Sequence, residues 1–112
     1  METRYSEQVR RLAEAVLGTP GDSAPALRRA VEQRAASIGG RAMTTAPEVP
    51  PQLLAYVDTV ARHAYRTTDE LVAALKRAGY SEDAIFELTL SAALGAGMAR
   101  LERGLAALGG RD

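Results

Sequence analysis

The stretch Ser91-Ala-Ala-Leu-Gly-Ala-Gly-Met-Ala99 decides how this chain packs, because seven of its nine residues are serine, alanine or glycine. Two glycines inside a helix cost about 1 kcal/mol each relative to alanine, so close packing has to offset them. Small residues recur four positions apart, which lets the backbone of another helix come close. Two interpretations stay open, a tight crossing within the chain and a symmetric contact between subunits. The small pairs are Ser91/Gly95, Ala92/Ala96 and Ala93/Gly97.

The helix around this tract is expected to be the last and longest, starting after a Ser81 cap. One apolar stripe contains Ile85, Leu88 and Ala92. A helix with a second stripe is apolar over a wide arc, so it either sits centrally or uses one stripe for a subunit partner. The second stripe has spacings of four and three and consists of Leu90, Leu94, Met98, Leu101, Leu105 and Leu108.

Helix start and stop signals predict four more helices upstream, and no alternating strand pattern occurs. The fourth helix has the clearest start, a capping box with Thr67 as N-cap and Glu70 at the third position. We therefore expect an all-α bundle of about five helices that forms one domain overall. Its parts are an N-terminal helical hairpin at 1–40, a Pro-rich loop at 41–50 that is either a linker or a lid, and a helical core at 51–112.

The composition excludes several classes of function. The chain has 112 residues, 14 basic and 14 acidic side chains, and no cysteine. Zero net charge gives no electrostatic case for binding nucleic acid or an anionic membrane. The basic pairs Arg10-Arg11 and Arg28-Arg29 are interpreted as solvated helix faces. No metal or cofactor motif and no signal or membrane-spanning run is present, so we expect a cytoplasmic protein without metal or cofactor.

The only histidine, His63, is the first catalytic candidate, because histidine exchanges protons near neutral pH. Tyr65 is a second catalytic candidate close to it in sequence. Tyr56, Arg66 and Glu70 are candidates for binding a substrate. The alternative is that His63 borders the core and bonds to water, and that Glu70 only stabilises a helix start.

Glu87 is the third catalytic candidate, since it lies in the apolar sequence Ile85-Phe-Glu-Leu-Thr-Leu90. If the carboxyl group is buried, its pKa rises and it can act as a general acid or base. If it lies on the polar arc of the helix, it is an ordinary exposed acid.

Three consecutive segments carry a resemblance to a known family: Ala74-Leu-Lys-Arg-Ala-Gly79, Tyr80-Ser-Glu-Asp-Ala-Ile-Phe-Glu87, and Leu88-Thr-Leu-Ser-Ala-Ala-Leu-Gly-Ala-Gly97. From about residue 51 to 108 the chain resembles the carboxymuconolactone decarboxylase and AhpD-like (alkylhydroperoxidase-like) superfamily. The resemblance implies an all-α fold and a homo-oligomer, a trimer or a hexamer, built around the small-residue helices.

The family's peroxidase branch uses two cysteines, a histidine and a glutamate, but the matching positions here are Ala64, Thr67, Leu71 and Gln52. Thiol peroxidase chemistry is therefore impossible in this chain. The resemblance leaves two functions open. One is a small acid–base enzyme of decarboxylase, isomerase or hydrolase type, with lyase-like chemistry, that acts on a small organic acid or lactone. The other is a non-catalytic helical oligomer that serves as a scaffold for a ligand or a protein partner.

Overall fold

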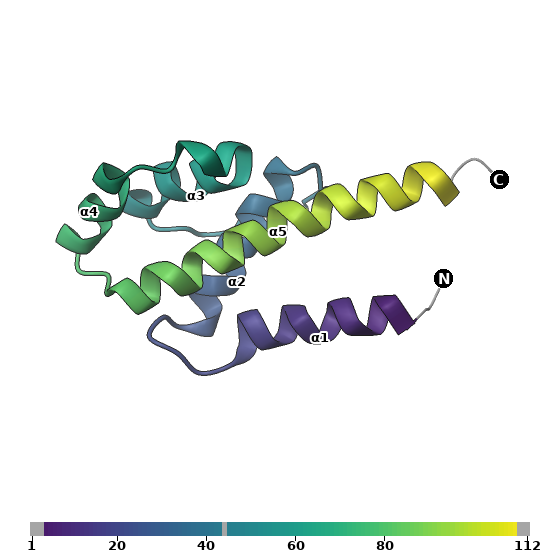
Figure 1. Ribbon diagram of the computed structural model, residues 1–112, viewed down its shortest axis with the longest axis horizontal. Coiled ribbons are helices and arrows are strands. Elements are labelled where there is room, and N and C mark those ends of the chain that lie inside the picture. Colours follow the sequence, from purple (N-terminus) through teal and green to yellow (C-terminus); the bar gives the residue numbers. More distant parts are fainter. Residues whose placement is uncertain (1–3, 44, 110–112) are drawn as a thin grey trace.

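The computed structural model describes residues 4–43 and 45–109, and its regular structure in these ranges is entirely helical (Figure 1). The prediction of an all-α fold with five helices is confirmed, and one short 3₁₀ turn is added to it. The elements are α1 (Arg4–Gly18), α2 (Pro25–Ile38), α3 (Pro51–His63), the 3₁₀ turn η1 (Ala64–Arg66), α4 (Asp69–Arg77) and α5 (Glu82–Gly109).

Helix α5 runs along the long axis of the molecule, and α1 runs beside it in the opposite direction (Figure 1). Helix α2 packs more extensively on α5 than any other helix does. Helices α3 and α4 lie near the first half of α5, while the C-terminal half extends toward the same end of the molecule as the start of α1 (Figure 1). The second half of α5 is therefore covered less than the first.

Apart from Tyr56, the core is built from small and aliphatic side chains, as the scarcity of large rings in the sequence requires. Val31 and Ala35 of α2 belong to the same buried cluster as Leu53 and Val57 of α3. Residues from α5 complete the cluster, so the segment 1–40 contributes directly to the core that it shares with 51–112. The buried residues of α5 in this cluster are Ile85, Leu88, Ala92 and Ala96.

The small-residue tract has two faces with different surroundings. A Cβ atom on Gly95 would overlap the carbonyl oxygen of Glu32 in α2 and lie 3.1 Å from the backbone nitrogen of Ala36. A Cβ atom on Gly97 would meet no atom within 4 Å. The tight crossing within the chain is thus confirmed for the face that contains Gly95, whereas Ala93 and Gly97 face outward.

The start of α4 lies one residue later than the sequence predicts. Thr68 is the N-cap, and its hydroxyl accepts a hydrogen bond from the backbone N–H of Leu71 at 3.2 Å. The hydroxyl of Thr67 instead donates to the carbonyl of Ala64 at 2.9 Å, because Thr67 ends the η1 turn and α4 begins only after it. The prediction of a capping box with Thr67 as N-cap and Glu70 at the third position is therefore wrong.

Gly79 ends α4 in the way its position predicts. Its φ of 105° lies in the left-handed region that glycine tolerates best. The N–H of Tyr80 donates a hydrogen bond to the carbonyl of Leu75 at 3.1 Å, and the N–H of Gly79 donates one to the carbonyl of Lys76 at 3.0 Å. These two bonds form a Schellman motif, which turns the chain sharply into α5.

Candidate functional site

His63, Tyr65 and Arg66 lie together at the end of α3, and all three are exposed. The rings of His63 and Tyr65 meet edge to face with centroids 5.6 Å apart. The guanidinium carbon of Arg66 lies 5.7 Å from the centre of the Tyr65 ring, and Tyr65 is 78% exposed. The adjoining hollow has a volume of about 240 Å³ and is open to solvent. It is lined by Asp58, Thr59, Arg62, His63 and Arg66.

The other predicted site residues lie elsewhere. Tyr56 is buried in the core, and its hydroxyl is 2.7 Å from the hydroxyl of Thr89. Glu70 is exposed in the first turn of α4. Neither residue lines the hollow beside His63. Two of the three catalytic candidates, His63 and Tyr65, are thus neighbours, but the substrate-binding candidates do not gather around them apart from Arg66.

Glu87 has a structural environment that differs from the apolar one its sequence neighbours indicate. Its carboxylate accepts hydrogen bonds from the hydroxyl of Ser23 at 2.5 Å, from the N–H of Ser23 at 2.8 Å and from the N–H of Asp22 at 2.9 Å. The Ser23 hydroxyl and the two N–H groups lower the pKa of Glu87. The expectation that the carboxyl group of Glu87 is buried and has a raised pKa is therefore wrong, because the side chain binds the start of α2 instead of entering the core.

Arg28 is a buried residue whose role the sequence did not reveal. Its side chain is 2% exposed, so its interpretation as part of a solvated face is wrong. The guanidinium donates to the carbonyl of Val16 at 2.7 Å and also to the carbonyls of Thr19 and Ser23. Arg28 thus satisfies carbonyls at the end of α1, while Glu87 satisfies N–H groups before α2. Both charges serve to fix the connection between these helices.

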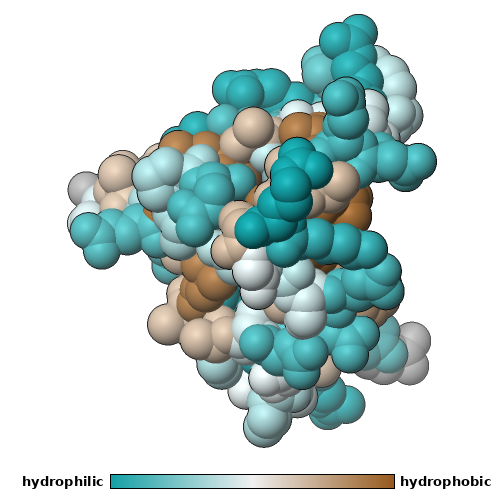
Figure 2. Space-filling view, turned by 90° about the vertical axis from the view of Figure 1, so that its left-hand side faces the viewer, coloured by the Kyte–Doolittle hydropathy of each residue, from teal (hydrophilic) through white to brown (hydrophobic). Residues whose placement is uncertain are grey.

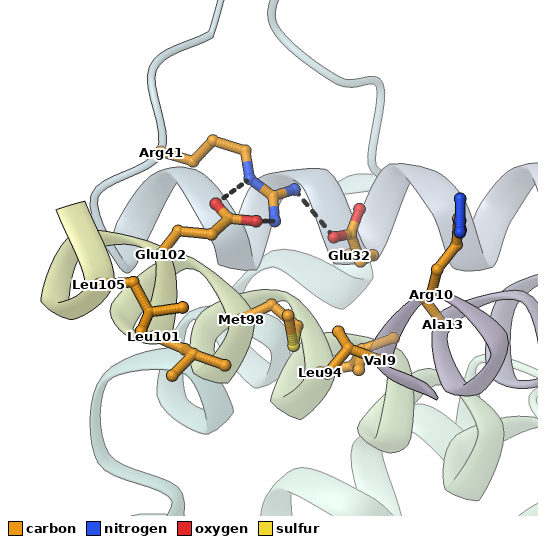
Figure 3. A pocket seen from close by; sticks show the side chains of 10 residues that line it. All are labelled: Val9, Arg10, Ala13, Glu32, Arg41, Leu94, Met98, Leu101, Glu102 and Leu105. Atoms are coloured by element: carbon orange, nitrogen blue, oxygen red, sulfur yellow. Dashed lines mark hydrogen bonds and ion pairs between the residues drawn. The ribbon is translucent and has the colours of Figure 1, made fainter. Parts of the chain in front are cut away.

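A groove of about 320 Å³ lies between α1 and the second half of α5 (Figure 3). Val9 and four side chains of α5 make it mostly apolar. At its edge Arg41 donates to Glu102 at 3.0 and 3.2 Å and to Glu32 at 3.0 Å (Figure 3). Because two carboxylates already neutralise Arg41, this guanidinium is not available to bind an acidic ligand in the groove. The apolar lining from α5 is Leu94, Met98, Leu101 and Leu105.

A second uncovered surface, which we call the outer face of α5, begins beside this groove. Four of the six large hydrophobic side chains that are exposed in the described residues belong to α5. Phe86 is 62% exposed, Leu90 41% and Leu108 65%. Residues spaced by four and three lie on one side of a helix, and exposed Arg100 borders this side between Gly97 and Gly104, while Leu101 is half-buried and also lines the groove. The outer face consists of Phe86, Leu90, Ala93, Gly97, Leu101, Gly104 and Leu108.

Polar side chains predominate on the end of the molecule that carries α4, where apolar surface appears in separate patches (Figure 2).

Helix α5 is long and apolar enough to cross a membrane by length and composition, but 44% of its most apolar window is buried inside the fold. Within residues 4–43 and 45–109, no group of three or more His, Cys, Asp or Glu side chains could hold a metal ion.

Comparison with known protein families, with curated proteins and with solved structures finds no match to this chain.

Proposed function

We propose that this protein is a non-catalytic helical scaffold that binds another helix along the outer face of α5. The observation that carries the proposal is the row from Phe86 to Leu108, in which Phe86, Leu90 and Leu108 are exposed large hydrophobic side chains and small residues lie between them. Contiguous exposed apolar patches on soluble proteins often mark interaction sites. The row spans about 33 Å, the length of six helical turns, which suits a helix better than a small molecule.

The arrangement of the catalytic candidates supports a scaffold over an acid–base enzyme. An enzyme site needs several polar groups that converge on a cavity able to exclude water. His63 is exposed, Tyr56 is bonded to Thr89 inside the core, and Glu87 is committed to the start of α2. Membership of the carboxymuconolactone decarboxylase and AhpD-like superfamily, and acid–base chemistry on an organic acid or lactone, stay predictions.

The centre of the outer face suits close contact between helices. Ala93 and Gly97 are both exposed, and no atom lies within 4 Å of a Cβ placed on Gly97. A partner helix can therefore approach the backbone of α5 here, while Phe86 and Leu108 cover its two ends. The gain comes from apolar area removed from water, at about 25 cal/mol per Å².

Site-specific photo-crosslinking in the cells that produce the protein tests this proposal. A photoreactive residue in place of Ala93 should give a covalent protein product that mass spectrometry identifies. The same residue in place of Ala55, which is exposed on α3, is the matched control and should give none. If Ala93 gives no product, or gives the same products as Ala55, the scaffold proposal is wrong.

A further inference from the structure

The groove between α1 and the second half of α5 is lined by apolar side chains from both helices (Figure 3). Leu94, Met98 and Leu101 are half-buried along α5, and Val9 and Ala13 line the groove from α1. Its volume of about 320 Å³ lies at the lower end of the range of about 300–1,000 Å³ that ligand pockets occupy. Ligands of helical proteins often bind between helices in this way, so the groove is large enough for a small ligand.

The groove is long for its volume. The side chains of α5 that line it run from Leu94 to Leu105, a distance of about 16 Å along the helix. A volume of about 320 Å³ spread over this length gives a mean width of only about 4 to 5 Å. Carbon atoms in contact lie about 3.5–4.0 Å apart, so this width suits one row of carbon atoms. The shape therefore fits a single extended aliphatic chain better than a compact ring system.

The charged side chains that line the groove already have partners within the protein. Arg10 donates to Glu7 at 2.6 Å. Arg41 donates to Glu32 and to Glu102, each at 3.0 Å. A charged ligand would lose its hydration here without gaining a free partner of opposite charge, which costs free energy. An uncharged ligand suffers no such loss, so the charge pairing of the lining favours it.

We propose that this groove binds an uncharged molecule with one extended aliphatic chain, such as a fatty alcohol, and that the chain lies along α5 between Leu94 and Leu105. The binding site goes beyond the proposed function, since it lies beside the outer face and does not depend on a partner helix. Helix α1 provides a way in. Among residues 7–18 only Leu17 is buried, so the first turns of α1 can move aside at little cost to admit the chain.

The methionines of the chain allow a direct test by nuclear magnetic resonance. Met98 lines the groove and Met43 does not, so carbon-13 labelling of the methionine methyl groups gives both a reporter and an internal control. In a titration with decanol at pH 7, the Met98 signal should shift and saturate while the Met43 signal stays in place. From hexanol through octanol to decanol, the affinity should rise by up to about fourfold for each added methylene group. Decanoate and decylamine, which carry a charge, should bind at least about tenfold more weakly than decanol.

Two variants of α1 show whether the shift comes from the groove. Ala13→Leu fills the groove and should weaken decanol binding at least about tenfold. Ala15→Leu, the matched control, adds the same side chain at an exposed position of α1 and should leave the affinity unchanged. Leu105→Gln keeps the test decisive if Ala13→Leu does not fold, because Leu105 is exposed and outside the buried core. It should weaken decanol binding more than hexanol binding, since the shorter chain need not reach it.

Three results would overturn the proposal. Equal shifts of Met98 and Met43 that do not saturate would mean that decanol binds without a defined site. Unchanged decanol affinity in both Ala13→Leu and Leu105→Gln would place the binding outside the groove. Decanoate or decylamine binding as tightly as decanol would contradict an uncharged ligand. The crosslink from Ala93 tests the scaffold function separately, so either proposal can fail while the other stands.

Discussion

The carboxylate of Glu87 and the residue Ser23 make two hydrogen bonds, one from the Ser23 hydroxyl at 2.5 Å and one from its N–H at 2.8 Å. These bonds join α5 to the start of α2 across 64 positions of sequence. The contact is close to Arg28, which satisfies the carbonyls on the other side of the same connection. The polar groups at this corner hold helices in place and leave little chemistry available for a substrate.

The first prediction concerns Glu87→Gln and its dependence on pH. The folded pKa of Glu87 is lowered, so its stabilising effect is present above the unfolded value of about 4.3 and is lost as the pH falls through the folded value. At pH 7 the variant should lose about 1 kcal/mol of unfolding free energy, and the difference should shrink as the pH falls below the unfolded pKa, because the carboxylate is then progressively protonated in the folded state. Urea denaturation at pH 7 and at about pH 3, which lies below the unfolded pKa, measures this. An equal difference at both would contradict the role of the charge.

A second prediction compares the neighbouring residues Arg28 and Arg29. Arg28→Ala leaves partly buried carbonyls at the end of α1 without their donors and removes a buried side chain, so it should cost about 3 kcal/mol of unfolding free energy. Arg29 is exposed, and Arg29→Ala should change stability by less than about 0.5 kcal/mol. Thermal denaturation of the two variants provides the measurement. Similar melting temperatures for both would show that Arg28 does not stabilise the corner.

A third prediction separates the two glycines of the small-residue tract. Gly95→Leu should prevent folding, because even a Cβ there overlaps the carbonyl of Glu32. Gly97→Leu should keep the helical circular dichroism spectrum but should weaken the photo-crosslink from Ala93, because its side chain keeps a partner helix away from the backbone of α5. Circular dichroism and the yield of the crosslink distinguish these outcomes. An unchanged crosslink in Gly97→Leu would argue against close helix contact at the outer face.

A fourth prediction concerns His63. Since the side chain is exposed at the end of α3, His63→Gln should change the unfolding free energy by less than about 0.5 kcal/mol and leave the solution mass unchanged. Differential scanning calorimetry and light scattering check both quantities. A large loss of stability would mean that His63 makes contacts its exposed position does not indicate.

The sequence predicts the fold well where one local rule decides it. The apolar stripe with Leu88 and Ala92 identifies the buried side of α5, and Gly79 identifies the end of α4 because few other residues adopt its φ. The predicted N-cap of α4 was one residue too early because Thr67 and Thr68 are adjacent and have the same side chain. The turn η1, which the sequence pattern does not reveal, decides which of them caps the helix.

The candidate site was harder to predict, because it depends on which distant segments meet. Nothing near Glu87 in sequence indicates that Asp22 and Ser23 supply its hydrogen bonds. Arg28 and Arg29 look alike in sequence, and only the position of the α1 carbonyls makes one buried and the other exposed. The outward direction of Gly97 likewise follows from where α2 lies, since Gly95 two positions earlier is covered by it.

The way α1 packs has a consequence for local unfolding of the chain. Among residues 7–18, only Leu17 is buried, and the hydrogen bonds of Arg28 lie at the same end of the helix. Local opening needs the least free energy where few apolar contacts are lost, so α1 should fray from its N-terminal end while the end near Leu17 stays attached. Amide hydrogen exchange should therefore slow progressively from the first turn of α1 to its last. A protease should shorten the chain from this side first and spare the contact between α2 and α5.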